Sequence, residues 1–91
     1  MMATIALPTP LRPYAGKNSE VNVAGNTVGD ALTDLTNQYP DLKRHLFGDD
    51  GELRSFVNVY LNDEDIRFLD KKATELGASD SLSIIPSIAG G

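Results

Sequence analysis

One segment of the sequence has the repeat of an amphipathic α-helix, and the segments on either side of it have the repeat of β-strands. The apolar side chains of this segment, residues 27–39, recur at helical spacing and are Val28, Ala31, Leu32, Leu35 and Tyr39. Thr27 stands at its start, where the hydroxyl can accept the amide hydrogen of Asp30 as an N-cap. Pro40 ends it, because the residue before a proline disfavours the helical conformation. The sequence therefore predicts one long helix with one apolar stripe.

Five further segments have the period-two alternation of half-buried strands. They cover residues 3–8, 19–25, 54–62, 65–69 and 81–86. The first two are expected to pair as a hairpin with an enlarged loop, and the third and fourth to pair through a tip at residues 62–64. In the last strand Leu82 and Ile84 should face inward, and Pro86 should end the ladder because it has no amide hydrogen.

The order strand, strand, helix, strand, strand, strand predicts an α+β fold in which one main helix packs across one face of a mixed sheet of four to five strands. For 91 residues the β-grasp is the economical arrangement of these elements. We expect a β-grasp domain over residues 1–86 and a flexible tail over residues 87–91. Because glycine packs nothing and loses the most freedom on ordering, the final Gly90-Gly91 pair adds no stability to such a fold.

Composition excludes several classes of function. With 13 acidic and 8 basic residues the net charge is −5, and the basic residues are scattered along the chain, which argues against a nucleic-acid partner. The chain has no cysteine, so disulfides, thiolate metal sites and cysteine nucleophiles are excluded. Its apolar runs are too short to span a membrane and its start has no basic, apolar signal segment, so we expect a cytoplasmic protein.

No metal site is predicted. The acidic loops at residues 48–52 and 62–65 lack the alternating ligands and distant glutamate of a calcium loop. His45 is the only histidine and has no carboxylate or nucleophile beside it in the sequence, so we interpret it as a polar residue at the end of a short helical turn.

Three stretches of the sequence carry a resemblance to a known family: LRPYAG at residues 11–16, FVNVYLNDEDIRF at residues 56–68 and GASDSLSIIPSIAGG at residues 77–91. Together they resemble the ubiquitin-like sulfur-carrier proteins, which include the molybdopterin synthase small subunit and the thiamine-pathway carrier. The similarity is strongest to the carriers of cysteine synthesis, which share the residue pattern of the hairpin at residues 56–68 and the small residues before the final two glycines. One departure is Ala78-Ser79-Asp80, where many members have Asp-Gly-Asp.

The resemblance implies that the chain is a protein co-substrate without a catalytic site or bound cofactor of its own. An E1-like adenylating enzyme would use ATP and Mg²⁺ to activate the Gly91 carboxylate, and a sulfur nucleophile would displace AMP to leave a thiocarboxylate. A sulfur-accepting synthase, similar to cysteine synthase, would be the second partner. The carrier itself is expected to be a monomer when free.

The residues expected to carry this function lie in the tail and on the sheet. Gly90 and Gly91 lack Cβ atoms and can thread a narrow channel, and five extended residues reach roughly 17 Å. Partner-binding residues are expected on the sheet face opposite the helix and along the root of the tail. They are Phe56, Tyr60, Ile85, Pro86, Ile88 and Ala89.

Three alternatives stay open. The sulfur could serve molybdopterin synthase or another pathway instead of cysteine synthesis. The activated carbonyl could be transferred to a lysine, which would make the chain a ubiquitin-like protein modifier. The chain could also be a non-catalytic interaction module in which the Gly-Gly ending is incidental.

Overall fold

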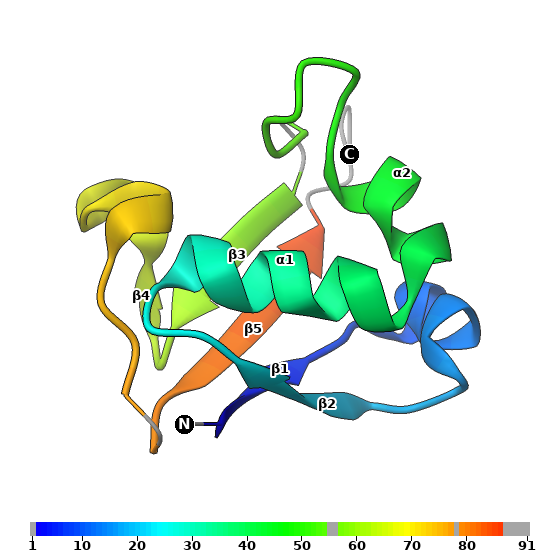
Figure 1. Ribbon diagram of the computed structural model, residues 1–91, viewed down its shortest axis with the longest axis horizontal. Coiled ribbons are helices and arrows are strands. Elements are labelled where there is room, and N and C mark those ends of the chain that lie inside the picture. Colours follow the sequence, from blue (N-terminus) through cyan, green and yellow to red (C-terminus); the bar gives the residue numbers. More distant parts are fainter. Residues whose placement is uncertain (1, 55–56, 78, 87–91) are drawn as a thin grey trace.

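A mixed sheet of five strands, in the order β2-β1-β5-β3-β4, forms one layer of the protein (Figure 1). The computed structural model describes residues 2–54, 57–77 and 79–86. The strands are β1 (Met2–Ala6), β2 (Glu20–Ala24), β3 (Val57–Leu61), β4 (Glu64–Asp65) and β5 (Ser81–Pro86). β1 and β5 are parallel, and the other neighbours are antiparallel. The predicted order of elements and the mixed sheet are therefore confirmed.

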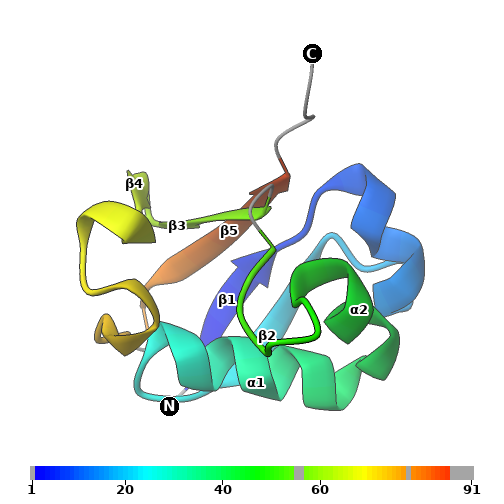
Figure 2. The ribbon, with the colours of Figure 1, turned by 90° about the horizontal axis from the view of Figure 1, so that it is seen from above.

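Helix α1 (Val28–Gln38) lies across one face of the sheet, as the view from above shows (Figure 2). Thr27 accepts the amide hydrogen of Asp30 at 3.1 Å, which confirms the predicted N-cap. Val28, Ala31, Leu32 and Leu35 are all buried. After Tyr39 the chain continues through the 3₁₀ helix η2 (Pro40–Leu42) into the short helix α2 (Lys43–Leu46), so the helical turn expected there is present as well.

The core lies between α1 and the sheet, and the alternation of β3 and β5 decides which side chains enter it. Val57 and Val59 of β3 and Leu82 and Ile84 of β5 are buried, while Ile85 is 48% exposed. β3 and β5 pair in the register that sets Val57 opposite Pro86. Ile85 therefore points away from α1, to the face that we call the outward face of the sheet.

The prediction of a strand over residues 65–69 was wrong beyond its first residue. β4 ends at Asp65, and residues Ile66–Phe68 form the 3₁₀ helix η3. Asp65 accepts the amide hydrogen of Arg67 at 2.9 Å and so caps this helix. The cap turns the chain out of the ladder and buries Ile66, which is 3% exposed.

Two other connections are helical where no regular element was expected. The enlarged loop of the first hairpin contains the 3₁₀ helix η1 (Thr9–Ala15), and the segment before β5 contains η4 (Lys71–Ala73). Leu11 and Tyr14 of η1 pack against the core, so this loop is part of the folded body. None of the helices in the described part of the chain is long and apolar enough to cross a membrane.

Candidate functional site

The end of β5 is held at a fixed point of the fold. The strand lies between two neighbours, with Ser81–Ser83 bonded to β1 and Leu82–Pro86 paired with β3. Pro86 is the last described residue and is half-buried. Pairing with β1 stops at Ser83, so β3 alone borders the last three residues of the strand, Ile84, Ile85 and Pro86. Gly90 and Gly91, the predicted reactive residues, lie outside the described residues, as do Ile88 and Ala89.

The outward face of the sheet brings together two of the predicted partner-binding residues. Ile85 lies opposite Asn58, and Tyr60 lies opposite Ser83. Tyr60 and Ile85 are thus diagonal neighbours on one face, a relation that places Cα atoms roughly 7–8 Å apart in antiparallel pairs. Tyr60 is half-buried and Ile85 is exposed, as the alternation predicted. Phe56, the third member, lies outside the described residues.

Phe68 is an exposed aromatic residue that the sequence reasoning missed. Phe68 is 79% exposed, more than Ile85, and is the last residue of η3. The prediction of a strand over residues 65–69 treated Phe68 as one side chain of an alternating pattern. The available signal was Asp65, because an aspartate whose side chain can bond the amide two residues on favours a turn over a strand.

A mainly apolar hollow, lined also by basic side chains, lies beside Pro86. Its lining includes Leu11, Ile84 and Pro86 together with Arg44, His45 and Arg54. The His45 ring stacks on Tyr14 with a centroid distance of 4.2 Å. The buried Nε2 atom of His45 has no hydrogen-bond partner among the described residues. His45 therefore packs against η1 at the end of α2, which agrees with the interpretation of it as a structural residue.

An ion pair joins Arg67 of η3 to Asp65 at the end of β4. Arg67 Nη2 is 2.8 Å from Asp65 Oδ2, and Arg67 also donates through Nε to both carboxylate oxygens at 3.2 Å. These side-chain bonds, followed by the bond from the Arg67 amide, hold the pKa of Asp65 below its usual value, and the same pairing raises the pKa of Arg67. Within the described residues, no three His, Cys, Asp or Glu side chains gather as metal ligands would.

Comparison with known proteins shows sequence similarity over nearly the whole chain. The model of the ThiS family matches residues 5–91. Sulfur carrier protein CysO of Mycobacterium tuberculosis is 40% identical over 93 residues, which cover 100% of both chains. Small archaeal modifier protein 1 of Haloferax volcanii is 42% identical over 83 residues, or 89% of this chain and 91% of the relative.

The fold of the chain is also similar to a solved structure of a CysO complex. The crystal structure of the BexX/CysO complex of Amycolatopsis orientalis contains a chain that superposes with a TM-score of 0.88 at 36% identity, covering 98% of this chain and 99% of that chain. The family match includes both the β5 strand and the final Gly90-Gly91 pair. It therefore covers every residue to which the sequence analysis assigned a functional role. The chain belongs to the ThiS family of ubiquitin-like sulfur carriers.

Proposed function

We propose that this chain is a sulfur carrier whose Gly91 carboxylate is adenylated by an ATP-dependent activating enzyme and then converted to a thiocarboxylate, which donates its sulfur for cysteine biosynthesis. The observation that carries the proposal is the end-to-end similarity to a protein named sulfur carrier CysO, with 40% identity over the full length of both chains. Sulfur transfer in other pathways, including molybdopterin synthesis, is the nearest alternative.

The chemistry assigns the activation step to a partner enzyme. A carboxylate is a poor electrophile at neutral pH, so the partner uses ATP and Mg²⁺ to convert the Gly91 carboxylate to an acyl-adenylate, with release of pyrophosphate. A sulfur nucleophile then attacks the carbonyl carbon, the bond to AMP breaks, and the thiocarboxylate remains. Glycine suits this position because the missing Cβ leaves both faces of the carbonyl open to attack. The chain itself acts as a co-substrate in the cytoplasm and not as an enzyme.

The geometry of β3 and β5 supports a docking site on the outward face of the sheet. We assign docking to the outward face through Tyr60 and Ile85, joined by Phe56, and to the root of the tail through Pro86, Ile88 and Ala89. The support is an exposed isoleucine and a half-buried tyrosine that share the sheet face opposite α1 (Figure 2). The Amycolatopsis relative was solved in a complex with BexX, which supports a protein partner.

A second function, modification of other proteins, is favoured by the similarity to small archaeal modifier protein 1. It shares the adenylation step and differs in the acceptor, which would be a lysine amine in place of a sulfur nucleophile. Material attached stably through Gly91 to proteins in cell extracts would support this function, and its absence would support the carrier.

Deletion of Gly90 and Gly91 tests both functions against a simple interaction module. The deletion removes no described core residue, so circular dichroism should show an unchanged fold. Adenylation, measured as ATP–pyrophosphate exchange with the activating enzyme, should be abolished. The proposal is contradicted if the shortened chain supports exchange as well as the full chain does. The matched control is Gly51→Ala, which changes a glycine with no atoms within 4 Å of the added methyl group and should leave exchange intact.

A further inference from the structure

The sheet has two edge strands, and only one of them is long enough to pair well with another chain. The described sheet ends in β2 on one side and in β4 on the other (Figure 1). β4 has 2 residues and β2 has 5, so β2 presents the longer row of main-chain groups. Unpaired N–H and C=O groups on an edge strand are a template on which a strand of another chain can form. The β2 edge is therefore the place where this sheet could be extended.

The pairing of β2 with β1 decides which main-chain groups of β2 point away from the sheet. Ser19, just before β2, accepts the Leu7 amide hydrogen at 2.8 Å and so faces the first strand. In an antiparallel ladder, residues alternate between facing the neighbouring strand and facing away from it. The N–H and C=O groups of Glu20, Asn22 and Ala24 therefore point to the open edge.

Two side chains of α1 bind these outward-pointing groups. The Ala24 amide donates its hydrogen to Oδ2 of Asp34 at 3.0 Å. The Asn22 carbonyl oxygen accepts a hydrogen from Nε2 of Gln38 at 2.9 Å. Gln38 Nε2 also donates to the same Asp34 oxygen at 2.9 Å, so the two side chains are joined to each other. Asp34 and Gln38 are one turn apart on α1, and we call them the edge pair.

The edge pair makes the hydrogen bonds that a neighbouring strand would otherwise make. It gives the Ala24 amide an acceptor and the Asn22 carbonyl a donor, so an added strand would have to displace both side chains. Displacement of the Asp34 carboxylate is the more costly step, because hydrogen bonds to charged groups are stronger than neutral ones. The carboxylate also places a negative charge at the edge, and charged side chains there disfavour pairing between strands.

A second copy of the chain is a strand donor that the β2 edge can accept once the edge pair is removed. In antiparallel pairing of two β2 strands about Asn22, Glu20 of one copy lies opposite Ala24 of the other, so no like charges are directly opposed. The buried residues Val21 and Val23 alternate with these and keep their place in the core. We propose that Asp34 and Gln38 block the β2 edge and so prevent two copies of the chain from pairing through it.

Amide hydrogen exchange in the unaltered chain tests whether the edge pair holds in solution. The amides of Ala24 and Asn22 point to the same edge, but only the Ala24 amide donates to the edge pair. By NMR, the protection factor of the Ala24 amide should exceed that of the Asn22 amide by about tenfold or more. Equal protection of the two amides would overturn the proposal, because the edge would then be open.

The double variant Asp34→Ala/Gln38→Ala tests the block itself. In sedimentation equilibrium, with salt to screen the net charge of −5, it should self-associate at least about tenfold more tightly than the parent chain. The matched control is Thr33→Ala/Asn37→Ala, which alters two exposed residues of the same helix that make no hydrogen bond to β2 within the described chain. Gln38→Ala alone is the milder variant if the double variant does not fold, and it is judged by the same result. A folded variant that stays monomeric, or equal self-association of the control, would overturn the proposal.

An introduced cysteine tests the geometry of the dimer, because the chain has no cysteine of its own. In the double variant, Asn22→Cys should form a disulfide between two copies, since paired Cα atoms at this position would be roughly 5.5 Å apart. Asn37→Cys in the same background, and Asn22→Cys in the parent chain, should cross-link at least about tenfold more slowly. Equal cross-linking rates would overturn pairing through β2.

This inference goes beyond the proposed function and does not depend on it. None of the three measurements involves ATP or Gly91. Their failure would leave the sulfur-carrier proposal standing, and failure of thiocarboxylate formation would leave the role of the edge pair standing.

Discussion

Replacement of Gly25 by alanine should destabilise the protein strongly, because this glycine lies where β2 turns into α1. Its φ is +150°, a conformation that residues with a Cβ rarely adopt. An added Cβ would lie 2.7 Å from the Asp30 Cβ and 2.9 Å from the Ala31 backbone nitrogen. Both atoms belong to the first turns of α1, so the clash can be relieved only by moving the backbone of the turn or of the helix.

The magnitude has two parts. An unfavourable backbone conformation costs about 1–3 kcal/mol, and forcing an extra carbon into a packed site costs a further 1–3 kcal/mol or so. The sum, about 2–6 kcal/mol, is a large fraction of the 5–15 kcal/mol that stabilises a typical domain. Urea unfolding followed by circular dichroism measures the change, provided that the m-value of the variant matches that of the parent chain.

Gly51→Ala is the matched control for Gly25→Ala. Gly51 also has a positive φ, +79°, but an added methyl group would have no atom within 4 Å. Only the backbone cost of about 1–2 kcal/mol should appear there. If both variants lose the same unfolding free energy, the contact between the β2–α1 turn and α1 is not what makes Gly25 necessary, and the reasoning is refuted.

Three further predictions concern the cap, the ion pair and β5. Thr27→Ala should lower the unfolding free energy by about 1 kcal/mol in the same assay, because the Asp30 amide loses its acceptor; no loss would contradict the cap. The pKa of Asp65 is lowered in the folded state, so its stabilisation is present above the unfolded value near 3.8 and disappears as the pH falls through the lower folded value. The stability gap between the parent chain and Asp65→Asn should therefore narrow in acid titrations below about pH 5, and a constant gap would contradict the assignment. Leu82→Ala should cost about 2–5 kcal/mol, whereas Ile85→Ser on the same strand should change stability by less than about 1 kcal/mol and weaken adenylation; an unchanged adenylation rate would contradict the docking face.

The features that could be predicted from the sequence are those set by local periodicity. The helical spacing of Val28, Leu32 and Leu35 and the alternation in β3 and β5 each follow from which side chains must be buried. The Thr27 cap was predictable for the same reason, since donor and acceptor are three residues apart. Once one helix and five strands are placed in order, few arrangements can bury their apolar faces together.

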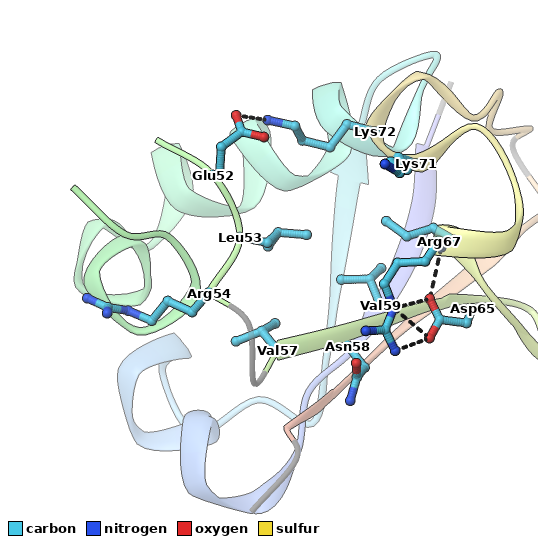
Figure 3. Close-up of a pocket in the computed structure, with 11 residues that line it drawn as sticks. Glu52, Leu53, Arg54, Val57, Asn58, Val59, Asp65, Arg67, Lys71 and Lys72 are labelled. Carbon is cyan, nitrogen blue, oxygen red and sulfur yellow. Dashed lines mark hydrogen bonds and ion pairs between the residues drawn. The ribbon is translucent and has the colours of Figure 1, made fainter. Parts of the chain in front are cut away.

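The short 3₁₀ helices could not be predicted in this way, because they contain too few residues to show a period. η3 depends on one cap at Asp65. The strand-like pattern of residues 65–69 led instead to the prediction of a strand. A cavity beside β3, lined by residues 52–54, 57–59, 65–67 and 71–72, forms only in the tertiary structure and could not be predicted from the sequence (Figure 3). Glu52 and Lys72, which pair across it, are separated by 20 residues in the chain. Basic residues that are scattered in the sequence thus come to line one opening.

The central claim, that the Gly91 carboxylate receives sulfur, is tested most directly by intact mass spectrometry. The chain would be incubated with ATP, Mg²⁺, sulfide and an activating enzyme that binds it and is active on its own carrier in a parallel reaction. Our account predicts that the mass rises by the difference between one sulfur and one oxygen atom, and that the added mass is found in the terminal peptide containing Gly91. An unchanged mass in that mixture, or an increase located elsewhere in the chain, would contradict it.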